Sequence, residues 1–164
     1  MPASASLTYE QALAQLADGP PRIAALADGR SPAHLHAAPS PGEWSANDLL
    51  AHLRTCADVW GDYITRILTE DHPTIRAISP RTHLKRTNYP NLDFHPSLAA
   101  FTSQRAALLT LLNPLPPQAW SRTATVKANG RILERTVLSY ADLLARHEQS
   151  HLDQLASIIA AAST

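Results

Sequence analysis

Two histidines near the end of the chain have the spacing of metal ligands. His147 and His151 stand four residues apart in the segment His147-Glu148-Gln149-Ser150-His151. Residues at i and i+4 of a helix lie on the same face about one turn apart, so both imidazoles can reach one cation. Leu144 and Leu155 continue the same spacing, which places the pair on the apolar, inward side of the predicted helix.

His52 is the candidate for a third ligand from another helix. It lies between Leu49 and Leu53 on the apolar face of a second predicted helix. A histidine buried among leucines costs free energy unless it has a polar partner. Three such histidines on two facing helices would satisfy one another by sharing a divalent cation. Three neutral nitrogens leave a coordination position open, where a bound water has a lowered pKa and can act as a nucleophile.

Other interpretations of these residues stay open. The segment also satisfies the bare zincin expression, in which Glu148 would be a general base and hence a candidate catalytic residue. A zincin needs a further ligand downstream, and after His151 the chain offers no histidine and one acid, Asp153. Each histidine can also be a core residue bonded to a carbonyl. Cys56, one turn after His52, is interpreted as an inert buried thiol or a soft ligand.

The composition predicts a single globular domain over residues 1–164. Hydrophobic residues make up 45% of the 164 residues, and 14 Lys+Arg balance 14 Asp+Glu. A net charge of zero argues against nucleic acid as a partner, because phosphate neutralisation needs excess positive charge. The single cysteine excludes an intrachain disulfide and a cysteine-based zinc site, so any metal must be held by nitrogen. We expect a cytoplasmic protein without a membrane partner, since the sequence shows no signal peptide and no long apolar run.

The hydrophobic periodicity predicts four long helices. They cover about residues 9–27, 45–70, 96–112 and 139–159. Gly19-Pro20-Pro21 predicts a kink or break in the first helix. Residues 71–95 are expected to be a long loop that could form a lid over the site. Asn129-Gly130, between two short β-prone runs, predicts a type I′ hairpin.

These elements predict an all-α fold, an antiparallel four-helix bundle with a small β-hairpin before the last helix. The remaining tryptophan and histidine side chains are expected to have no part in the site. Trp44 and Trp120 are expected to be packing anchors beside helix starts. The histidines outside the trio are expected on the surface or in the loop, and they are His34, His36, His72, His83 and His95.

The ordered combination of motifs resembles the DinB/YfiT-like superfamily. The resemblance begins at Glu43-Trp44-Ser45 and Leu50-Ala51-His52-Leu53, continues through residues 105–120, and ends at His147-x-x-x-His151-Leu152-x-Gln154-Leu155. It covers nearly the whole chain and implies a bundle with a divalent metal on His52, His147 and His151. The metal that this resemblance implies is zinc, nickel or iron.

The resemblance also implies a function. Family members are described as metal-dependent hydrolases, and relatives include thiol-dependent transferases. We therefore expect a hydrolase acting on a small-molecule substrate, with a low-molecular-weight-thiol-dependent S-transferase as the alternative. A non-catalytic dimeric module with a structural metal is the third hypothesis, and a homodimer is expected in each case.

Overall fold

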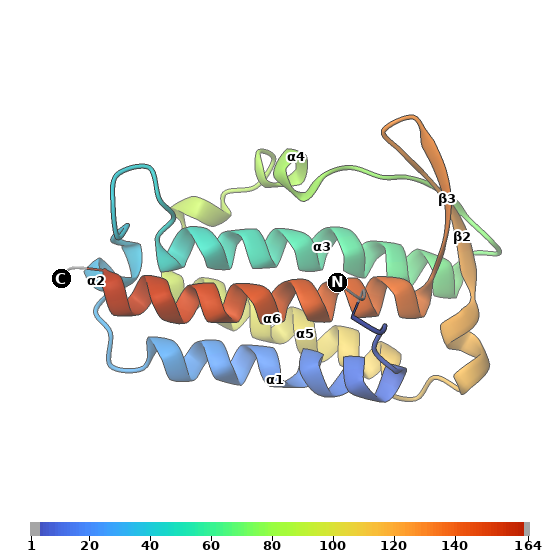
Figure 1. Cartoon of the computed structure of the whole chain (residues 1–164), viewed down its shortest axis with the longest axis horizontal. Helices are drawn as coiled ribbons and strands as arrows, with labels where there is room; N and C mark the ends of the chain where they lie inside the picture. Colours follow the sequence, from blue (N-terminus) through green and yellow to red (C-terminus); the bar gives the residue numbers. More distant parts are fainter. Residues whose placement is uncertain (1–3, 163–164) are drawn as a thin grey trace.

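The computed structural model describes residues 4–162, and within them four long helices lie side by side (Figure 1). Helices α1 and α3 each pack against α5 and α6, so the four helices form a ring in section. None of the described helices combines the length and the apolar character that a membrane span requires. The four helices are α1 (Tyr9–Ala27), α3 (Ala46–Thr69), α5 (Phe94–Leu112) and α6 (Val137–Ala161).

Side-chain caps fix where three of these helices begin. Thr8 and Ser45 accept hydrogen bonds from the third residue of α1 and α3, each in a reciprocal capping box. Helix α6 begins two residues earlier than predicted, because Thr136 is its cap and Ser139 is the partner within the first turn. Helix α5 begins at Phe94, after Asp93 rather than at Pro96.

The four helices do not simply alternate in direction, which corrects the antiparallel prediction. In Figure 1, α3 and α5 run one way and α1 and α6 the other. Near the start of α3, Asn47 donates a hydrogen bond of 3.1 Å to the carbonyl of Leu92, just before α5 begins. Leu7, just before α1, donates a bond of 2.8 Å to Asp142 in the first turns of α6. These neighbours are therefore parallel, whereas α3 and α6 are antiparallel.

The segment 71–95 explains this topology and is more than an unstructured loop. It carries the chain back along α3, so that α5 begins at the same end of the bundle as α3 (Figure 1). Its first strand was not predicted, because three residues are too few for a visible alternation. It contains β1 (Thr74–Arg76), the short helix α4 (Pro80–Leu84) and the 3-10 turn η1 (Tyr89–Asn91).

A small sheet closes one end of the bundle. The predicted hairpin is formed by β2 (Thr123–Ala128) and β3 (Arg131–Thr136), which pair antiparallel. Asn129 and Gly130 both have positive φ, 49° and 74°, as the two-residue turn requires. Strand β1 pairs parallel with β2, giving the order β1-β2-β3 among the described residues. The turn η2 (Pro117–Ser121) precedes the hairpin.

The prediction of a break in α1 is wrong, because one 19-residue helix runs through Gly19-Pro20-Pro21. A proline at position 20 cannot donate to the carbonyl of Leu16 four residues earlier. Arg105 of α5 supplies the missing donor, with Nη1 at 2.8 Å from that oxygen. A tertiary hydrogen bond thus replaces the one that the helix lacks.

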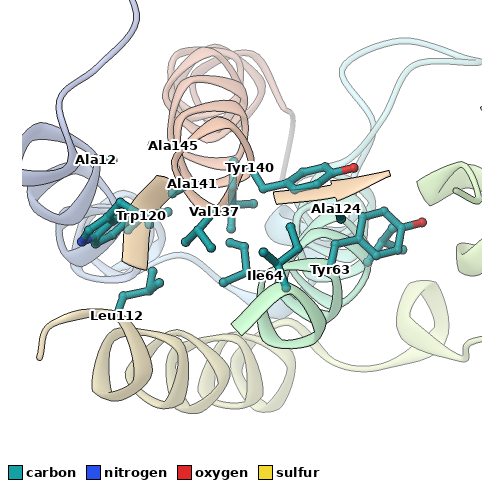
Figure 2. Close-up of a cluster of buried hydrophobic side chains, with 14 of the residues drawn as sticks. Ala12, Tyr63, Ile64, Leu112, Trp120, Ala124, Val137, Tyr140, Ala141 and Ala145 are labelled. Carbon is teal, nitrogen blue, oxygen red and sulfur yellow. The ribbon is translucent and has the colours of Figure 1, made fainter. Parts of the chain in front are cut away.

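Two apolar clusters fill the bundle. Figure 2 shows the cluster at the sheet end, where Trp120, Leu112 and Val137 converge beneath the strands. The second cluster lies toward the opposite end and includes Phe94 and Phe101. Along α5 and α6, Arg105, His147, Glu148 and His151 separate the members of the two clusters, whereas His52 of α3 lies among residues of the second cluster. The interior polar side chains form a polar layer across the bundle, and Gly19 of α1 lies against it. The layer consists of His52, Arg105, His147, Glu148 and His151.

One of the histidines predicted to be on the surface is buried. His34, in α2 (Pro32–His36), is 6% exposed, and its Nε2 lies 2.6 Å from the carbonyl oxygen of Ile159. This contact ties α2 to the last turns of α6. His36, two residues on, is exposed as predicted.

Candidate metal centre

The structure brings the three predicted histidines together in the polar layer. Nε2 of His147 lies 3.2 Å from Nε2 of His52 and 3.1 Å from Nε2 of His151. One ligand nitrogen from each side chain lies within 4.8 Å of the others, and all three side chains are half-buried. Helix α3 supplies one imidazole and α6 two, as the i, i+4 spacing predicts.

The donor set fits a divalent cation. A single ring nitrogen carries one hydrogen or one lone pair, so Nε2 of His147 can make at most one good hydrogen bond to its two neighbours. A shared cation satisfies all three nitrogens. At a metal–nitrogen distance of roughly 2.0–2.1 Å, tetrahedral ligands stand about 3.3 Å apart. The observed spacings of 3.1 and 3.2 Å are close to that value.

Burial keeps two of the imidazoles in the neutral form that metals bind. Desolvation, with a smaller contribution from the neighbouring His151, lowers the pKa of His52 to about 4. Desolvation likewise lowers the pKa of His147 to about 4, aided by the adjacent imidazoles. Both rings are therefore unprotonated lone-pair donors at neutral pH.

Aromatic rings and one amide orient the imidazoles. Trp44 lies beside His52, with ring centroids 5.2 Å apart, and is 39% exposed. It thus borders the site on its solvent side. This position differs from the predicted role of Trp44 as a packing anchor. Trp60 meets His147 edge-on at 5.1 Å. Nδ1 of His151 lies 2.8 Å from the amide oxygen of Gln154, which fixes its tautomer with the lone pair on Nε2.

Two further candidates from the sequence have other surroundings. Both carboxylate oxygens of Glu148 accept hydrogen bonds from Arg105, at 2.8 and 2.6 Å. The Cys56 sulfur lies 3.6 Å from Nε2 of His52, but burial raises the pKa of this thiol to about 12. The thiol therefore stays protonated, which suits an inert neighbour better than a ligand.

The loop histidines do not join the trio. Nε2 of His83, in α4, lies 3.1 Å from a carboxylate oxygen of Asp58 on α3. The ring nitrogens of His72 each lie 2.9 Å from the hydroxyl of a threonine in β2. The segment nevertheless acts on the site through charge, since the positive charge of Arg81 adds a small contribution to the lowered pKa of His52.

A cavity of about 680 Å³ opens beside one of the three histidines. Its wall includes His147 and two arginines, Arg135 and Arg146. Arg146 pairs with Asp142 at 2.7 Å, and the cavity is also bordered by the exposed Leu143. The cavity therefore offers hydroxyl, guanidinium and apolar groups next to the ligand cluster.

The sequence model of the DinB superfamily matches residues 15–155, which include all three histidines. The chain belongs to the DinB superfamily. The fold is similar to a solved structure, YfiT from Bacillus subtilis, with a TM-score of 0.77 at 19% sequence identity. The likeness covers 96% of this chain and 90% of that chain. YfiT is described as a probable metal-dependent hydrolase with an unusual four-helix bundle topology. No curated protein sequence matches the chain.

Sequence reasoning missed one polar residue of this DinB-superfamily protein. Arg105 is 2% exposed and lies on the inward face of α5, between Phe101 and Leu108. A charged residue at the spacing of an apolar stripe predicts a buried ion pair. The same test applied to α6 marks Glu148 as its partner, so the pair was open to prediction.

Proposed function

We propose that this protein is a divalent-metal-dependent hydrolase acting on a small molecule, with His52, His147 and His151 as the metal ligands. The convergence of three Nε2 atoms at a spacing suited to one cation carries the proposal. When bound, such a cation supplies a Lewis acid and lowers the pKa of a water that serves as nucleophile. A nitrogen-only set suits zinc, nickel and iron alike.

The residues around the trio would prepare it for this role. Desolvation holds His52 and His147 unprotonated, and Gln154 keeps a lone pair on His151 directed toward them. Trp44 would limit water on the exposed side. The cavity beside His147 would hold the substrate, and its Arg135 and Arg146 favour a substrate with an anionic or strongly polar group.

The same cavity supports a second candidate, transfer to a low-molecular-weight thiol. A volume of about 680 Å³ is large enough for a small thiol carrier beside its acceptor, and its arginines would pair with carboxylates on that carrier. Hydrolysis in the absence of added thiol separates the two reactions.

Metal analysis of protein purified without a nickel column tests the proposal. We expect about one equivalent of metal in the wild type and a loss of metal and activity in His151→Ala. The control is His36→Ala, an exposed histidine outside the site, which should keep both. A wild type that stays free of metal after incubation with zinc, nickel or iron would overturn the proposal. Metal whose removal abolishes folding, without any accompanying activity, would favour the structural-metal module instead.

A further inference from the structure

An ion pair in the polar layer is not used by the proposed function. Arg105 of α5 and Glu148 of α6 are 2% and 1% exposed, and they form two hydrogen bonds of 2.8 and 2.6 Å. Arg105 also lies near the ring of Phe101, 4.9 Å from its centroid. Buried ion pairs seldom stabilise a protein more than apolar groups of the same volume, so stability alone does not explain this one.

Helix α1 is shaped to receive the pair. Pro20 leaves the carbonyl of Leu16 without an intrahelical donor, and Arg105 donates to that oxygen at 2.8 Å. A Cβ atom on Gly19 would lie 1.8 Å from Oε1 of Glu148, so only glycine admits the carboxylate here. The residues that predicted a broken helix therefore form the seat of the ion pair. We call Arg105 and Glu148, together with the part of α1 that receives them, the seated ion pair. That part of α1 consists of Leu16, Gly19 and Pro20.

The seated ion pair lies at the same level of α6 as the ligands. Glu148 follows His147 directly and precedes His151 by three residues. Adjacent helical residues are about 100° apart, so α6 presents its acid to α1 and α5 and its imidazoles to α3. Two bonds to Arg105 thus fix the rotation of the helix segment that carries both ligands.

The required precision is high. Side chains reach about 5–6 Å from a helix axis, so a 20° rotation of α6 would move the imidazole nitrogens by about 2 Å. Metal–ligand distances tolerate only about 0.2 Å. A helix held by apolar packing alone has shallow rotational restraints, whereas two charge-assisted bonds in one plane define a single orientation.

We infer that the seated ion pair is a positioning device that sets the rotation of α6 and thereby the geometry and affinity of the metal centre. The inference rests on the proposed function, because it assigns Arg105 and Glu148 a role toward the metal that the three histidines would bind. Neither residue is a ligand. They act through the backbone of α6.

The test is a variant that removes both charges and keeps the fold. In Arg105→Met/Glu148→Leu no unpaired charge is left in the interior, so the bundle should still fold cooperatively. We expect its Kd for zinc, measured by competition with a chelator, to rise about 10- to 100-fold. The absorption spectrum of the cobalt-loaded protein should change as well, since it reports the ligand geometry. Gly19→Ala displaces the carboxylate without removing a charge and should shift both readouts in the same direction.

Leu112→Ala is the matched control. Leu112 is fully buried on the same helix as Arg105, two turns away, so its truncation lowers stability without touching the seated ion pair. We expect the zinc affinity and cobalt spectrum of this variant to be those of the wild type. A folded double variant with unchanged affinity and spectrum would overturn the inference while leaving the proposed function standing. A wild type that binds none of zinc, nickel, iron and cobalt would overturn both.

Discussion

The two sides of α6 hold polar groups that are satisfied in opposite ways. On the side of α1 and α5, Glu148 is sealed and both its oxygens are bonded to Arg105. On the side of α3, His52, His147 and His151 are half-buried and turn their nitrogens toward one another. Within residues 4–162, Nδ1 of His147 is buried without a hydrogen-bond partner.

The difference separates a structural polar cluster from a binding one. A buried group that its own chain satisfies fixes the fold, and removing its partner is costly. A cluster of like acceptors that its own chain leaves poorly satisfied needs something from outside. The following predictions test this contrast by changing one side of α6 at a time.

The largest loss of stability should come from breaking the Arg105–Glu148 pair on the side of α1 and α5. In Glu148→Leu the guanidinium of Arg105 remains buried without its counter-charge, so we expect the free energy of unfolding to fall by about 3–5 kcal/mol. Chemical denaturation measures this loss. The double variant Arg105→Met/Glu148→Leu should recover most of it. A single variant within 1 kcal/mol of the wild type would show that the pair is not sealed from water.

On the side of α3, added metal should change the free energy of unfolding through the three histidines. At a metal concentration about 100-fold above Kd, the wild type should gain about 2.7 kcal/mol in free energy of unfolding. His151→Ala should lose this gain while remaining folded, because its half-buried imidazole does not pair with a buried charge. Thermal unfolding with and without chelator measures both. His36→Ala should keep the full gain, and an equal gain in His151→Ala would refute the ligand assignment.

Two glycines in helices offer a finer test of the seat in α1. Gly19→Ala should cost about 1–3 kcal/mol, as overpacking does, because its Cβ would meet the Glu148 carboxylate. Gly61→Ala should stabilise the protein by up to about 1 kcal/mol, since nothing lies within 4 Å of its Cβ position and alanine favours the helix. Denaturation midpoints of the two variants should move in opposite directions. Similar shifts would argue that Gly19 is an ordinary helix residue.

The last prediction concerns pH in the metal-free protein. Desolvation lowers the pKa of His52 and of His147 from 6.5 to about 4, so the unfolded chain takes up protons first as the pH falls. Stability should therefore be fully present above pH 6.5 and decline between about pH 6.5 and 4. His52→Gln should make this decline shallower. A decline of unchanged steepness in His52→Gln would place the responsible groups elsewhere.

The sequence predicted that His52, His147 and His151 would cluster, because their spacing and apolar neighbours are local features. His147 and His151 are one turn apart, and His52 is flanked by leucines. The Asn129-Gly130 turn is equally local, since its two positive φ angles follow from residue type.

Features that depend on tertiary pairing were not predicted. Gly19-Pro20-Pro21 predicts a break from residue type alone, but the donor that the Leu16 carbonyl finds is 89 residues away in the sequence. The direction of α5 depends on whether residues 71–95 turn back at once or travel along α3. Prolines and polar residues in that segment are compatible with either path.

The parallel packing of the first and last helices has a consequence for the order of assembly. Helix α1 packs along α6, and the seated ion pair joins α1, α5 and α6. The apolar faces that α1 and α3 turn toward α6 are therefore covered only when this 25-residue helix docks. His52 likewise meets His147 and His151 only when α6 has docked. If the three histidines bind a metal as proposed, the complete ligand set exists only once α6 has docked against α3.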